Sequence, residues 1–170
     1  PEIDGYVPEL AESYQIFVDG QSVQLTLHAG ECGCIHNIYQ AIESGAQRIG
    51  HGIVLKGDPQ AQAYVREQGV LIEGCPTSNV HTRAIDAYAT YPLREWLQNQ
   101  VHFCLNTDNR TVSNTTLTNE YWQMVQHCGL TKNELETIMV HAVHHSFASK
   151  EDKDALLAQL AVFSDEEMMK

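Results

Sequence analysis

The feature that most constrains the fold of this chain is a strand-like apolar run followed by a helical pattern, repeated four times along 170 residues. The expected strands cover residues 23–27, 47–49, 70–73 and 101–105, and the expected helices after them cover residues 35–43, 60–67, 92–98 and 118–127. Alternation of this kind is typical of an α/β fold with a parallel sheet. Four such units amount to half of a (β/α)8 barrel, whose complete form takes ~250 residues.

Helical patterns also flank the four units. One is expected over residues 8–17, before the first strand. Thr131 and Glu134 have the spacing of a capping box, which predicts a helix that runs to about residue 147. A last amphipathic helix is expected over residues 152–163. Linkers, low-complexity tracts and coiled-coil patterns are absent from the sequence, so we expect one domain.

Polar residues follow each expected strand at its carboxyl end. These clusters are residues 28–31, 50–52, 75–79 and 106–109. In a (β/α)8 barrel this face of the sheet holds the active site, and in an open α/β sheet the same edge holds ligands. The fold would therefore bring the four clusters together.

Four side chains in these clusters have the chemistry of a metal-assisted reaction: His28, Glu31, His51 and Asp108. A neutral imidazole suits Zn²⁺, and a neighbouring carboxylate suits proton transfer. Each residue also has an ordinary structural interpretation: a His and a Glu on a solvated loop, a turn histidine between two glycines, and an aspartate that caps a helix or forms an Asx-turn. Their placement on successive strand ends favours a common site.

Four motifs give the chain a family resemblance. His28-Ala29-Gly30-Glu31, Arg48-Ile49-Gly50-His51-Gly52, Cys75-Pro76-Thr77-Ser78-Asn79 and Leu105-Asn106-Thr107-Asp108 occur in the order and approximate spacing of the adenosine deaminase family. The similarity runs from about Leu25 to Tyr121. It implies that residues 1–170 are a single partial domain, the C-terminal half of the catalytic barrel with its strands five to eight.

The resemblance also implies a role for each matching residue. His28 and Asp108 match zinc ligands of the family, and Glu31 matches the glutamate that protonates N1 of the purine as water attacks C6. His51 matches the histidine that orients the metal-bound water and helps with its proton. The implied reaction is hydrolytic deamination of adenosine and 2'-deoxyadenosine to inosine. Zinc lowers the pKa of bound water to ~7.

The sequence departs from the family pattern at two points. The best-known members have a second aspartate that contacts N7 of the purine, and Asn109 stands there in this chain. An amide can donate a hydrogen bond to N7, so we expect Asn109 to bind substrate. A His-x-His pair, which supplies two further zinc ligands in the family, does not occur in these 170 residues. We therefore expect a fragment that binds zinc weakly and does not turn over alone.

Two other functions remain open on the sequence. One is deamination of adenine or another 6-aminopurine. The other is a non-catalytic remnant that binds a purine or a protein, which the absent half of the metal site favours.

The composition of the chain disfavours some classes of binding partner. Ten basic and 22 acidic residues give a net charge of −12, which disfavours nucleic acid and anionic membrane surfaces. A small-molecule purine nucleoside fits better, together with a missing N-terminal half-barrel or self-association through the exposed half-barrel surface. Five cysteines without a signal peptide suggest a cytoplasmic protein, and a start at proline suggests that the chain begins inside a longer one.

Several other residues have simpler interpretations. We interpret three histidines as a cluster on one face of the late helix: His141, His144 and His145. We expect packed thiols near the pocket at Cys32 and Cys34, and core positions at Trp96, Phe103 and Trp122. Two arginines could contact substrate: Arg83 and Arg110.

Overall fold

A computed structural model describes residues 17–18 and 21–168 of the chain. The helix predicted over residues 8–17 lies outside these residues, apart from Phe17. That residue belongs to the short strand β1 (Phe17–Val18), which pairs antiparallel with β2 (Gln21–Ser22).

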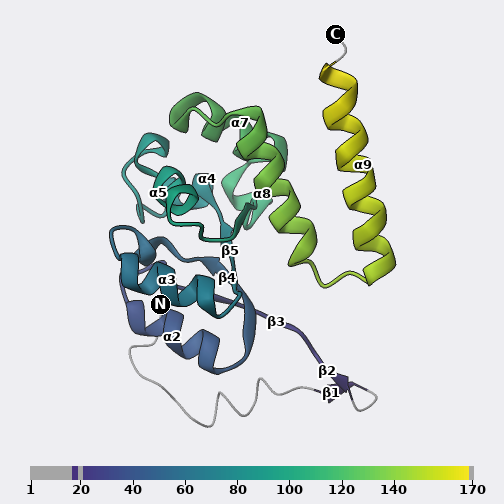
Figure 1. The fold of residues 1–170 in the computed structure, drawn as a ribbon. Helices are drawn as coiled ribbons and strands as arrows, with labels where there is room; N and C mark the ends of the chain where they lie inside the picture. The colour runs from purple at the N-terminus through teal and green to yellow at the C-terminus, as the bar shows by residue number, and fades with distance from the viewer. Residues whose placement is uncertain (1–16, 19–20, 169–170) are drawn as a thin grey trace.

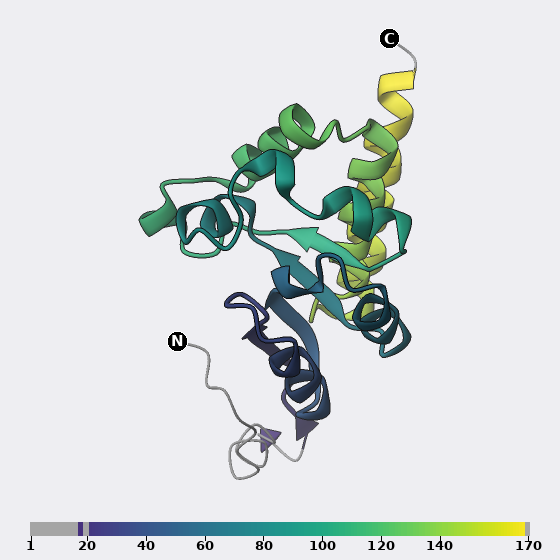
Figure 2. The same ribbon diagram turned by 90° about the vertical axis from the view of Figure 1, so that its left-hand side faces the viewer.

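Four parallel strands form the centre of the molecule, in the spatial order β3-β4-β5-β6 (Figure 2). The predicted strands are all present, displaced by one or two residues at their ends. The second strand, predicted over residues 47–49, is longer and extends to His51. The observed bounds are Leu25–Ala29 for β3, Ala46–His51 for β4, Leu71–Gly74 for β5 and Phe103–Leu105 for β6.

The predicted helices follow the strands as expected. Figure 1 shows α8 and α9 side by side at one flank of the sheet, and α8 packs against β6. The capping box of Thr131 and Glu134 is present, but α7 is capped by Thr116 rather than Thr118. The observed bounds are Ile35–Glu43 for α2, Pro59–Glu67 for α3, Leu93–Gln98 for α5, Leu117–Cys128 for α7, Lys132–His144 for α8 and Lys150–Met168 for α9.

Two short helices were not predicted; one overlaps the polar cluster of residues 75–79, and the other follows the cluster of residues 106–109. They are α4 (Pro76–His81), after β5, and α6 (Arg110–Ser113), after β6. Single turns of 3₁₀ helix cover Ile53–Leu55 and Tyr88–Thr90. Sequence periodicity did not reveal α4 and α6 because four to six residues are too few to show a helical repeat.

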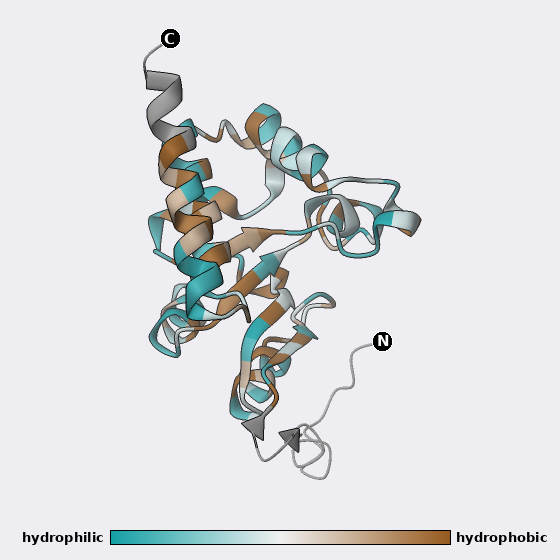
Figure 3. Ribbon diagram, turned by 90° about the vertical axis from the view of Figure 1, so that its right-hand side faces the viewer, coloured by the Kyte–Doolittle hydropathy of each residue, from teal (hydrophilic) through white to brown (hydrophobic). Residues whose placement is uncertain are grey.

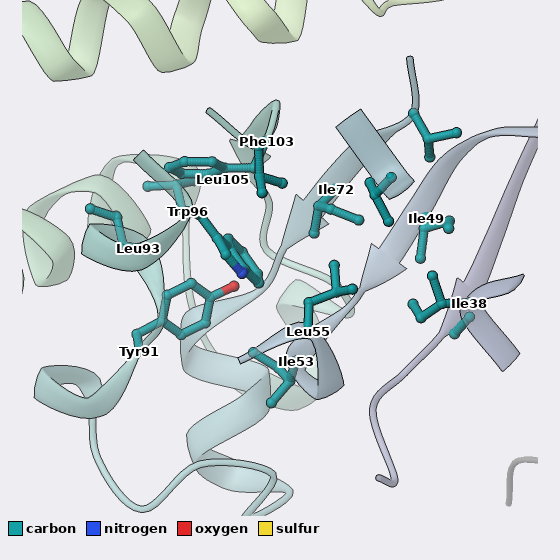
Figure 4. Packing of buried hydrophobic residues seen from close by; sticks show 14 of the residues in the cluster. Ile38, Ile49, Ile53, Leu55, Ile72, Tyr91, Leu93, Trp96, Phe103 and Leu105 are labelled. Atoms are coloured by element: carbon teal, nitrogen blue, oxygen red, sulfur yellow. The ribbon is translucent and has the colours of Figure 1, made fainter. Parts of the chain in front are cut away.

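The hydrophobic core lies between the sheet and its helices (Figure 4). Ile49, Ile72 and Phe103 reach it from the strands, and Trp96 reaches it from α5. Figure 3 shows the hydrophobic residues along the strands, while α9 mixes hydrophilic and hydrophobic positions. Trp122, which was predicted to be core, is 58% exposed on α7, so that prediction was wrong. No helix among the described residues is long and apolar enough to cross a membrane.

The sheet is open at both sides. Among the described residues, β3 and β6 each pair with one strand of this sheet only. A parallel sheet of four strands with its helices is half of a (β/α)8 barrel, as the strand–helix alternation predicted.

Candidate functional site

Three strand ends bring their polar side chains to one point. His28 is near the end of β3, His51 is the last residue of β4, and Asp108 follows β6. One ligand atom from each of the three lies within 4.8 Å of the other two. Two imidazoles and a carboxylate are donors that zinc accepts. The chemistry of this donor set therefore fits the predicted metal.

The backbone is strained where this site is formed. His51 has φ 70° and Asp108 has φ 52°, both in the left-handed region that residues with a Cβ rarely adopt. Each such residue costs on the order of 1–3 kcal/mol and persists only where the surrounding structure enforces it. Strain of this kind clusters at functional sites, and here it aims two of the three side chains.

Gly50 makes room for His28. The two residues are opposite each other in the β3–β4 register. A Cβ on Gly50 would lie 2.5 Å from His28 Cδ2, so the ring or the strand would have to shift to accept it. The His28 ring packs edge to face on the His51 ring, with 4.7 Å between centroids. The glycine therefore allows the two imidazoles to reach the same site.

Glu31 lies beside the ligand cluster, just after the turn at Gly30. Its Oε2 is 3.6 Å from Nε2 of His51, and Thr82 donates a hydrogen bond of 3.2 Å to its Oε1. The carboxylate also lines a pocket of ≈ 490 Å³. The remaining lining residues are Cys32, Gly33, Ile53, Val54, Thr82, Arg83 and Ala84.

The helix α4 supplies hydrogen bonds that sequence reasoning missed. Ser78 donates from Oγ to Oδ2 of Asp108 at 2.7 Å, and the Asn79 amide lies 3.1 Å from Nδ1 of His51. Both residues belong to a motif that the sequence singled out, but the motif was interpreted as a polar cluster after a strand. Their partners are 28 and 30 residues away in the sequence, and no local spacing indicates contacts at that range.

Asn109 has a structural role at the same face of the sheet. It is the N-cap of α6, and its Oδ1 accepts a hydrogen bond of 3.0 Å from the Val112 backbone N–H. This bond uses the amide oxygen, so the amide nitrogen is the group that could donate to a purine nitrogen. Contact with substrate stays a prediction.

The other candidates fall into two groups. Arg83 and Cys32 line the pocket beside Glu31, but Cys32 is exposed, so its description as a packed thiol was wrong. His141 and His145 gather instead around His102, which precedes β6. That cluster is therefore at the opposite end of the strand from Asp108. The helix-face interpretation holds for His141, whereas His145 is the C-cap residue that follows α8.

The chain was compared with known protein families. The family model described as adenosine deaminase matches residues 4–162. The chain belongs to the adenosine deaminase family. Family membership confirms the resemblance read from the four motifs.

Relatives and solved structures agree with this assignment. An adenosine deaminase of Enterococcus faecalis is 41% identical over 155 residues, which cover 91% of this chain and 46% of the relative. The crystal structure of an adenine deaminase from Arthrobacter aurescens matches with 28% identity and a TM-score of 0.80, over 84% of this chain and 44% of that one. An N6-methyl-AMP deaminase from Arabidopsis thaliana matches with 28% identity and a TM-score of 0.74, over 84% and 42%.

The chain thus spans about half the length of the curated relatives that it matches. The structural matches cover a similar share of their own chains. Half a barrel is what the four-stranded parallel sheet provides.

Proposed function

We propose that the whole protein to which this chain contributes deaminates adenosine and 2'-deoxyadenosine hydrolytically, giving inosine or its deoxy form and ammonia. The observation that carries the proposal is the convergence of His28, His51 and Asp108 within 4.8 Å, with Glu31 beside them. This is a metal donor set next to a proton donor, and both stand at the carboxyl ends of parallel strands, where such sites are built.

We assign zinc to His28 and Asp108, the two members of the donor set that match the family's ligands. When bound there, zinc would supply a water that loses its proton near neutral pH. Ser78 binds one oxygen of Asp108, which leaves the other oxygen for the metal. Two further ligands are expected from outside this chain, because a catalytic zinc site usually has three or more protein ligands.

Glu31 and His51 would handle the protons. Glu31 lies beside the ligand cluster, with its Oε2 3.6 Å from Nε2 of His51, so its carboxyl group can donate a proton to N1 of a purine bound at that cluster. That proton makes the ring a better acceptor for attack at C6. His51 faces Glu31 through Nε2, from where it can orient the attacking water and hold its proton until ammonia leaves. Asn109 would donate to N7 from its amide nitrogen.

A second substrate class has specific support. The structural match with the TM-score of 0.80 is an adenine deaminase, and another match is an N6-methyl-AMP deaminase. These proteins share the half-barrel but act on different 6-aminopurines by their names. Asn109 also favours a purine other than adenosine, because it replaces the aspartate that contacts N7 in the best-known members.

Substrate profiling of the whole protein tests the proposal. Adenosine, 2'-deoxyadenosine, adenine and N6-methyl-AMP would be compared by kcat/KM, with ammonia release as the common measurement. Adenosine and 2'-deoxyadenosine should lead. A much higher kcat/KM for adenine would instead support the second class. Zinc-loaded, folded protein that deaminates none of the four would favour a non-catalytic remnant.

A further inference from the structure

The short helix α4 and its C-cap residue Thr82 contact three polar groups of the proposed site, Glu31, His51 and Asp108. Ser78 donates a hydrogen bond to Asp108, and Asn79 contacts His51. Thr82, the C-cap residue that follows the helix, donates to Glu31. These three partners come from the ends of three different strands. One helix thus sets the positions of groups that the sequence places far apart.

The position of α4 is itself fixed from behind. Glu120 of α7 is fully buried, and its Oε2 accepts a hydrogen bond of 2.9 Å from the Thr77 backbone N–H in the first turn of α4. Its other oxygen accepts from Thr115 Oγ1 at 2.5 Å. A buried carboxylate with both oxygens bonded holds its partners firmly, because breaking either bond leaves a polar group without water. Figure 1 shows α4 beneath α7.

Asn79 and its partner His51 are both buried. The relative exposure of Asn79 is 0%, and that of His51 is 1%. Its Nδ2 lies 3.1 Å from His51 Nδ1, while its Oδ1 is buried without a hydrogen-bond partner among the described residues. The amide can therefore meet Nδ1 with either end: Nδ2 donates to it, or Oδ1 accepts a proton from it.

Either arrangement has the same consequence for the ring. With Nδ1 engaged by Asn79, the nitrogen that faces Glu31 is Nε2, at 3.6 Å from Oε2. A ring turned by 180° about its Cβ–Cγ bond would place carbon atoms in those positions and lose the amide bond. The left-handed backbone of His51, at φ 70°, needs such outside support.

We propose that Asn79 is a positioning residue for the proposed deaminase site, and that its side-chain amide fixes the His51 ring with Nε2 turned toward Glu31 and the ligand cluster. The inference rests on the proposed function for its catalytic meaning. Its structural part concerns the His51 ring alone and can be tested without any turnover.

The test is a long-range ¹H–¹⁵N spectrum of the histidine rings in the 170-residue chain at one mildly alkaline pH. His51 is assigned by the signal that disappears in His51→Gln. In the wild type, the His51 nitrogens should show the shifts of one neutral tautomer. In Asn79→Leu, which has a similar volume but no polar group, the two nitrogen shifts should move toward an average. Ser78→Ala, the neighbouring change on the same helix, should leave the His51 signals unchanged.

The proposal would be overturned by an Asn79→Leu chain that is folded by circular dichroism and has wild-type His51 signals. If Asn79→Leu does not fold, Asn79→Ser provides a smaller change, since its shorter hydroxyl cannot reach Nδ1.

A kinetic measurement on the whole protein separates this inference from the proposed function. If Asn79 positions His51 for catalysis, Asn79→Leu lowers kcat about 10- to 100-fold, as loss of an outer-shell partner commonly does, and leaves KM unchanged. A raised KM with unchanged kcat would contradict the positioning role. Absence of deamination in the wild type, with the His51 ring fixed as expected, would refute the proposed function and leave the contact between Asn79 and His51 intact.

Discussion

Single atoms decide the geometry at the carboxyl ends of the strands. The His28 ring lies so close to Gly50 that a Cβ at this residue would be 2.5 Å from His28 Cδ2. The His51 and Asp108 side chains are aimed by left-handed backbone that costs free energy. Each of these residues is thus placed by a local constraint as well as by the sheet.

Gly50→Ala tests the close contact with His28. The added methyl group would force the ring or the strand to move, so we expect a loss of about 1–3 kcal/mol in unfolding free energy and weaker zinc binding. The measurements are urea unfolding and zinc titration. Gly45→Ala is the matched control, because no atom lies within 4 Å of its Cβ and its φ is +90°. It should lower stability through backbone strain alone, and equal loss of zinc affinity in both variants would contradict the account.

At the scale of elements, the strands and the long helices could be predicted from the sequence, whereas the short helices α4 and α6 could not. Helix α2 has the predicted bounds because its apolar residues repeat at helical spacing and Gly45 follows its end. Helix α4 has six residues, too few for a helical repeat, so Pro76 in its first turn is a start signal with no periodic pattern after it. His28, Glu31, His51 and Asp108 could be chosen from strand ends, whereas Ser78 and Asn79 act through contacts that only the folded chain creates.

The capping box of α8 gives a prediction for stability. Thr131 Oγ1 accepts from the Glu134 backbone N–H, and the Glu134 side chain accepts from the Thr131 backbone N–H. This bond from the Thr131 backbone is the main reason why the pKa of Glu134 is lowered. Thr131→Ala should reduce the unfolding free energy by about 1 kcal/mol. Thr137→Ala, at an exposed position of the same helix, should change it by less than about 0.5 kcal/mol.

The histidine cluster between α8 and β6 predicts a pH dependence. Burial, followed in size by charge repulsion from His102, lowers the pKa of His141 and of His145 to about 4, from 6.5. His144, Arg48 and Lys153 act in the same direction on His145. The unfolded chain therefore takes up protons first as pH falls, so the stability contribution is complete above pH 6.5 and is lost toward pH 4.

Urea unfolding between pH 6.5 and pH 4 measures this effect. His145→Gln retains a polar group next to His102 but cannot titrate, so its unfolding midpoint should fall less steeply with pH than that of the wild type. Parallel curves for the two proteins would show that the cluster does not titrate as described.

At the scale of the whole molecule, the proposal gives this chain two of the zinc ligands, His28 and Asp108. The sheet is open at β3 and β6 among the described residues. We expect the purified 170-residue chain to bind zinc more weakly than the whole protein and to release no ammonia from adenosine. We also expect self-association that increases with concentration in sedimentation velocity, since open strand edges pair readily. Robust deamination by this chain alone would contradict this expectation.

The central claim is that Glu31, beside His28, His51 and Asp108, performs the proton transfer of a deaminase. The most direct test compares ammonia release from adenosine by the whole protein and by its Glu31→Gln variant, with zinc content measured on the same samples. We predict that kcat falls by about 10²–10⁴ in the variant, while zinc content is unchanged because Glu31 is not a ligand. A zinc-loaded Glu31→Gln variant with wild-type kcat would contradict the claim.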